Sequence, residues 1–130
     1  MTAAAFLRTV QARVGEIDRE TAERATGAVF HALRDRLTPV EAAQVAAQLP
    51  APLKRLWAAD ARPRARPERL HREAFYRRVA AETGGASRRD ARELTLGVFA
   101  ALKEAISPGE ADDVWSQLPK DLKAVWAEAR

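Results

Sequence analysis

Two short phrases of this chain, QLPAPLKRLW and QLPKDLKAVW, are nearly identical, and they belong to a much longer internal repeat. The match runs without a gap at an offset of 69 residues, from Phe6 with Phe75 to Trp57 with Trp126. Similar sequences of this length adopt the same fold. The chain is therefore predicted to contain one set of structural elements twice.

Each copy has the pattern of four helices. The longest apolar stripe has a 3.6-residue period over four turns, as expected for one buried face of a helix. Its members are Ala22, Ala25, Thr26, Val29, Phe30, Leu33 and Leu37. Ala and Leu supply much of the apolar content, which favours helix over strand. Thr2, Asp18 and Ser87 are predicted helix N-caps, and Gly15 and Gly84 are predicted to end the first helix of each copy.

The third helix of each copy has the clearest start signal. It opens with TPVE at Thr38–Glu41 and with SPGE at Ser107–Glu110. A hydroxyl caps the helix, proline occupies the first turn, and the glutamate is expected to return a hydrogen bond to the cap's own N–H. Proline ends this helix at the repeated LP, and a short fourth helix then places Leu and Trp in the core.

A copy of roughly 55 residues buries too little apolar surface to be stable alone. We therefore expect an all-α protein in which two tandem four-helix repeats pack about a pseudo-twofold axis into one compact domain. Residues 1–60 form the first repeat and residues 75–130 the second. Residues 61–74 form a Pro/Arg-rich linker that leads into the first helix of the second repeat, and this helix is expected to begin at Pro67.

Basic charge is concentrated in that linker. The whole chain has a formal net charge of +4, and residues 61–74 hold five basic and two acidic side chains. Arg62, Arg64 and Arg66 are therefore candidate phosphate-binding residues of a cationic arm. The alternative, which we favour, is a stiff and solvated spacer.

No pattern of catalytic, cofactor-binding or metal-binding residues is recognisable. The absence of cysteine excludes disulfides, zinc–thiolate sites and cysteine nucleophiles. His31 is expected on an exposed helix surface and has no metal-ligand spacing. Glu110, Asp112 and Asp113 are explained by the favourable interaction of acids with a helix N-terminus. We therefore expect no enzyme activity, no cofactor and no metal.

The three tryptophans divide into two classes. Trp57 and Trp126 occupy equivalent positions and are expected in the core. Trp115 replaces Ala46 of the first copy, so it is a candidate partner-binding residue, since exposed Trp is a common hot spot. The alternative is local packing.

The start of the chain, MTAAAFLRTV, has no basic leader followed by a long apolar run, and no stretch approaches the ~20 residues of a membrane span. A cytoplasmic protein without membrane contact is expected.

The pattern as a whole resembles a bacterial family known as domain of unknown function 2267. The resemblance rests on FLRTVQARVG with FYRRVAAETGG, and on VFHALRDRLTPVEAAQVAAQLPAPLKRLW with VFAALKEAISPGEADDVWSQLP. It covers nearly the whole chain and implies an all-helical protein of two similar halves. The resemblance brings no activity and no site residues, and the Pro/Arg linker lies outside its pattern.

Three functions remain open. The first, which we favour, is a non-enzymatic helical module that binds a protein partner through Trp115 or a groove between the halves. The second is nucleic-acid binding by the linker arginines. The third is a small-molecule binder or enzyme with a pocket between the repeats.

Overall fold

The computed structural model describes residues 1–130 as eight helices without a strand. The helices are α1 (Ala3–Val14), α2 (Arg19–Arg36), α3 (Pro39–Ala47), α4 (Ala51–Ala58), α5 (Arg72–Glu82), α6 (Arg88–Ala105), α7 (Pro108–Ser116) and α8 (Lys120–Glu128). α2 and α6 have 18 residues each, and α3 and α7 have nine each. The starts of α1–α4 recur at α5–α8 with the 69-residue offset of the sequence repeat.

The predicted helix caps are confirmed. The Thr2 hydroxyl accepts a hydrogen bond from the Ala5 N–H at 3.0 Å. The Asp18 carboxylate and the Ser87 hydroxyl cap the long helices α2 and α6 in the same way. Each cap satisfies an N–H that has no partner within its helix.

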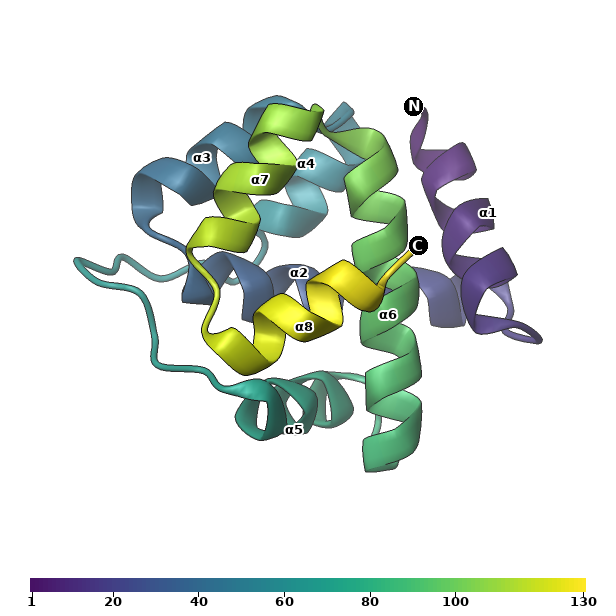
Figure 1. The fold of residues 1–130 in the computed structure, drawn as a ribbon. Coiled ribbons are helices and arrows are strands. Elements are labelled where there is room, and N and C mark those ends of the chain that lie inside the picture. Colours follow the sequence, from purple (N-terminus) through teal and green to yellow (C-terminus); the bar gives the residue numbers. More distant parts are fainter.

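The first helix of each copy packs against the second helix of the other copy. α1 lies along α6, and α5 packs against both α2 and α6 (Figure 1). Gly97 allows the close approach of α1 to α6, because a Cβ atom at this position would lie 2.5 Å from Cγ2 of Val14. The two copies therefore share one continuous core rather than forming separate units.

An aromatic trio lies at the same place in each copy. The trios are Phe6–Phe30–Trp57 and Phe75–Phe99–Trp126. Neighbouring rings are 4.9–5.7 Å apart between centroids and 60–66° apart between planes, the edge-on geometry that aromatic pairs prefer. Trp57 and Trp126 are 3% exposed, which confirms their predicted place in the core.

A basic side chain caps the fourth helix of each copy. Arg34 Nη1 donates to the carbonyl oxygens of Trp57 and Ala59, both at 2.8 Å. Lys103, at the equivalent position, donates to two carbonyls at the end of α8, at 2.9 and 2.8 Å. These carbonyls are at helix ends, where they lack partners within the helix. The repeat thus extends to polar contacts that hold α4 and α8 on the long helices.

The prediction that a helix begins at Pro67 is wrong, because α5 begins at Arg72. The Glu68 N–H donates to the Asp35 carbonyl at 2.7 Å, which ties the linker backbone to α2. Leu70 is buried ahead of the helix. The Arg72 N–H then donates to the carboxylate of Asp121 at 2.9 Å. Tertiary contacts therefore hold the chain extended where local sequence favours a helix.

The all-helical, compact fold is confirmed, and the pseudo-twofold relation between the copies stays a prediction. None of the eight helices combines the length and the apolar character that crossing a membrane requires.

Candidate functional site

The α3–α7 contact is built by two glutamines that exchange hydrogen bonds between the copies. The Ser107 N–H donates to Oε1 of Gln48 at 2.7 Å, and the Thr38 N–H donates to Oε1 of Gln117 at 2.9 Å. Gln117 Nε2 also donates to the Thr38 hydroxyl at 3.2 Å. Each glutamine follows the last turn of one helix and satisfies the first turn of the other. α3 and α7 therefore lie side by side with opposite directions (Figure 1).

Two capping hydrogen bonds were predicted at the start of each of these helices. One of them forms, and the glutamine of the opposite copy replaces the other. The Thr38 and Ser107 hydroxyls accept from the N–H groups of Glu41 and Glu110, at 3.2 and 3.1 Å, as expected. The glutamate side chains, however, do not return to the cap N–H groups, because the glutamines of the opposite copy already occupy them. Both carboxylates are thereby free to turn elsewhere.

The two glutamates turn toward each other and are buried. Glu41 is 6% and Glu110 is 7% exposed. With both acids ionised, Oε1 of Glu41 and Oε2 of Glu110 have no hydrogen-bond partner. Burial first, then the hydrogen bond and charge of Glu41, and then the charge of Asp113 raise the pKa of Glu110 from 4.5 to about 8. Two acids that face each other in a buried site cannot both ionise without a large cost, so the pair holds a proton at neutral pH.

Asp113 completes this carboxylate cluster from one side. One oxygen from each of Glu41, Glu110 and Asp113 can be chosen so that all three lie within 4.8 Å of one another. Asp113 is exposed, so the cluster is open to solvent on the Asp113 side. Three oxygens at this spacing can hold a proton or a hard cation.

Trp115 lies on the outward side of α7. Its side chain is 43% exposed, and Lys123 Nζ lies 4.4 Å from the ring centroid. Val40, near the start of α3, is 68% exposed. The Thr38–Gln117 hydrogen bond brings the ends of α3 and α7 that carry Val40 and Trp115 together. The molecule thus exposes two large apolar side chains at one end of the α3–α7 pair.

The linker arginines are not equivalent. Arg64 forms ion pairs with Asp35 at 3.2 Å and with Glu68 at 2.9 Å. Arg62 and Arg66 are exposed and form no ion pair. Of the three candidate phosphate-binding residues, one is held by acids of the protein and two present free charge.

Asp35 is the anchor of that linker and was not singled out from the sequence. It is 5% exposed and accepts from Arg34, Arg64 and Arg78, at 3.0, 3.2 and 2.8 Å. Burial alone raises the pKa of Asp35, but the hydrogen bonds and charges of Arg34 and Arg78 outweigh it, and the pKa lies below 3.8. The equivalent acid of the second copy, Glu104, is exposed, so spacing alone could not reveal this role.

The expectation that His31 is exposed is wrong. His31 is 7% exposed, with Nε2 at 2.8 Å from the Leu56 carbonyl and Nδ1 at 3.0 Å from Oε2 of Glu82. The ring joins α2 to α4 and to the end of α5. Its equivalent is Ala100, so this contact is specific to the first copy.

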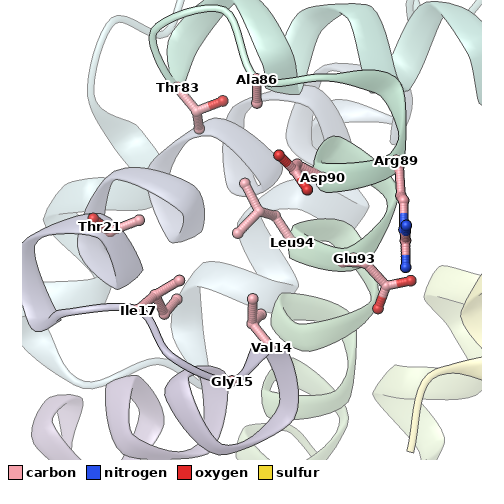
Figure 2. Close-up of a pocket in the computed structure, with 10 residues that line it drawn as sticks. All are labelled: Val14, Gly15, Ile17, Thr21, Thr83, Ala86, Arg89, Asp90, Glu93 and Leu94. Atoms are coloured by element: carbon pink, nitrogen blue, oxygen red, sulfur yellow. The ribbon is translucent and has the colours of Figure 1, made fainter.

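A cavity of about 580 Å³ lies where the α1–α2 and α5–α6 turns meet (Figure 2). Figure 2 shows Leu94, Asp90 and Thr83 around it, with Ile17 and Thr21 on the opposite side. Its charged lining residues are exposed at the rim. Residues of both repeats line this cavity, and it lacks the buried titratable groups of the α3–α7 contact.

Sequence reasoning missed Gln48 and Gln117, although one signal was present. Both belong to the repeated QLP phrase, at equivalent positions. Glutamine identical in two copies, next to a helix end, could have indicated a shared capping role. The buried meeting of Glu41 and Glu110 gave no such signal, because it depends on the packing of α3 against α7.

The sequence of the chain is similar to that of one known protein family. No curated protein matches the chain. The sequence pattern of the family described as "Uncharacterized conserved protein (DUF2267)" matches residues 3–125, which includes all helices up to most of α8. This match agrees with the resemblance found in the repeat. The chain therefore belongs to the DUF2267 family.

Proposed function

We propose that the protein is a non-enzymatic helical interaction module that binds a protein partner through the outward face of α7. The observation that carries this proposal is the exposure of Trp115. Its side chain is 43% exposed, whereas Trp57 and Trp126 are each 3% exposed. A large aromatic side chain in solvent is an energetic cost to the free protein, and such residues commonly anchor a partner.

The surroundings of Trp115 define the chemistry of that partner. Asp112 precedes Trp115 by one helical turn, so both side chains lie on the same side of α7. Asp112 is exposed and forms no ion pair. Val40 adds an apolar side chain from the adjacent end of α3. A segment with an apolar side chain next to a Lys or Arg would pack on the ring and pair with Asp112.

The difference between the copies supports a dedicated surface. Ala46 occupies the position equivalent to Trp115, and Ala43 the position equivalent to Asp112. The fold therefore forms in the first copy without either side chain. Residues that the fold does not require are available for binding.

A displayed peptide library selected against the immobilised protein tests this proposal. We expect selected peptides to combine an apolar residue with a neighbouring Lys or Arg. Trp115→Ala should weaken their binding at least about tenfold, as for a hot-spot residue. Asp112→Asn should weaken it about threefold and reduce its dependence on salt. Glu104→Gln, which removes an exposed acid on another helix, serves as the matched control and should have no effect.

Two results would overturn the proposal. One is peptide binding that survives Trp115→Ala unchanged, which would place the surface elsewhere. The other is failure of the library to yield any binder, combined with salt-dependent binding of labelled duplex DNA or RNA that is lost in an Arg62/Arg64/Arg66→Ala variant. That combination would transfer the function to the linker.

A further inference from the structure

Apart from Trp115, the α3–α7 contact holds a second feature that the proposed function does not use. Glu41 and Glu110 are more than nine-tenths buried, yet one oxygen of each makes no hydrogen bond. Buried polar atoms without a partner are rare in folded proteins. An acid pair that only supported the fold would be replaceable by apolar side chains. With both acids ionised, the two orphaned oxygens therefore need a positive partner, which is either a shared proton or a bound cation.

The neighbouring groups provide no such partner within the protein. Glu41 and Asp113 are the charged groups that act on Glu110, and both are acids. Neither Glu41 nor Glu110 forms an ion pair, in contrast to Asp35, which has three arginines. The remaining polar side chains of this contact, Gln48 and Gln117, are engaged at the helix caps.

We propose that Glu41, Glu110 and Asp113 bind a calcium ion between α3 and α7. All three supply carboxylate oxygens, the ligands that hard divalent cations prefer. The oxygens lie within 4.8 Å of one another. Ca²⁺ accepts carboxylates in flexible geometry, whereas Mg²⁺ demands a near-ideal octahedron and keeps most of its water, so three carboxylates from two helices suit Ca²⁺ better. Water completes the coordination on the open side beside Asp113.

The bound ion links the two copies of the repeat. Glu41 comes from the first copy, and Glu110 and Asp113 come from the second. Binding is therefore coupled to the packing of α3 against α7.

Titration calorimetry of the full chain with CaCl₂ and MgCl₂, after chelator treatment, tests the proposal. We expect Ca²⁺ to bind with one site per chain and more tightly than Mg²⁺.

Charge-neutral variants separate binding from folding. Glu41→Gln and Glu110→Gln keep the side-chain shape and remove the like-charge contact, so we expect both to fold and to melt no lower than the wild type in chelator. Each should lower the Ca²⁺ affinity at least about tenfold, since affinity follows ligand charge. Asp113→Asn should lower it less, because water and the other two ligands remain. Glu20→Gln removes an exposed acid from the first turn of α2 and is the matched control.

Either of two results would overturn the proposal. One is the absence of Ca²⁺ binding up to about 10 mM, ten times the weakest range of protein calcium sites; the pair would then only share a proton. The other is Ca²⁺ binding that Glu110→Gln leaves unchanged, which would assign the ion to surface acids. Neither result bears on peptide binding by Trp115, so the two proposals can fail separately.

Discussion

Asp35 and the Glu41–Glu110 pair are buried to nearly the same extent, but they lie in opposite electrostatic surroundings. Asp35 accepts from three arginines, and its pKa lies below its ordinary value although burial alone would raise it. Glu110 has only acids beside it, and burial and Glu41 raise its pKa to about 8. Asp35 therefore anchors the linker as a permanent charge, whereas the pair carries a proton that can leave. The role of each buried acid depends on a side chain that is distant in the sequence, Arg78 for Asp35 and Glu41 for Glu110.

The largest expected effect comes from breaking the Asp35 cluster. Asp35→Ala leaves Arg78 and Arg64 without their buried acceptor, and losing one partner of a buried ion pair costs about 3–5 kcal/mol. We expect the free energy of unfolding, measured in urea, to fall by about 3 kcal/mol, since Arg64 is partly exposed. Glu104→Ala, at the equivalent exposed position, should cost less than about 1 kcal/mol. Equal losses in the two variants would show that Asp35 is no anchor.

The next largest effect is expected in the pH dependence of stability, which should have opposite signs for Glu110 and Asp35. Between pH 4.5 and about 8 the folded protein holds the Glu110 proton and the unfolded chain does not. The free energy of unfolding should therefore fall as pH rises through this window, by about 2 kcal/mol in total, because solvent on the Asp113 side reduces the full cost of about 1.4 kcal/mol per pH unit. The Asp35 contribution has the opposite sign and is lost only as pH falls below 3.8.

The substitution Glu110→Gln removes the group that causes the pH dependence between pH 4.5 and about 8. In chelator we expect the variant to be about 2 kcal/mol more stable than the wild type at pH 8 and nearly equal at pH 5, because the raised pKa corresponds to a cost of ionisation. Urea unfolding at a series of pH values measures both. A constant difference between the two proteins across the series would mean that Glu110 does not exchange its proton there.

A smaller effect is expected for Gln48 and Gln117. Their hydrogen bonds to the cap N–H groups leave Glu41 and Glu110 free to face each other. Gln117→Ala removes the acceptor of the Thr38 N–H, at a cost of about 1 kcal/mol for one hydrogen bond. Glu41 can then return to this N–H, so the pKa of Glu110 should fall, as an NMR titration of the carboxyl carbon can measure. Gln44→Ala, an exposed glutamine of α3, is the control. An unchanged Glu110 titration would show that the glutamine does not direct Glu41.

Most of the fold could be predicted from local patterns, because they repeat. Thr38 and Ser107 cap their helices as expected, since the hydroxyl that accepts and the N–H that donates lie three residues apart in the chain. Predictions failed where distant segments compete with local preference. The helix predicted from Pro67 begins at Arg72, since Glu68 bonds to α2 instead. His31 is buried because Leu56 and Glu82 come to its ring.

The candidate site was less accessible to sequence reasoning for the same reason. Trp115 could be selected because the copies differ there, and comparison of repeats exposes such differences directly. Glu41 and Glu110 are identical in the two copies, and each is explained locally by its capping position. Only the packing of α3 against α7 shows that the carboxylates of Glu41 and Glu110 lie next to each other.

The packing of α1 on α6 has a consequence for how the chain is made. Val14 meets Gly97 more than 80 residues later in the sequence. A ribosome adding about 5–20 residues per second needs roughly 4–17 seconds to synthesise that interval. During this time α1 can pack only against α2 of its own copy, as Phe6 does on Phe30, and the side that meets α6 stays uncovered until the second half emerges. A chain stalled on the ribosome at this stage would expose that apolar surface, and such surfaces are aggregation-prone.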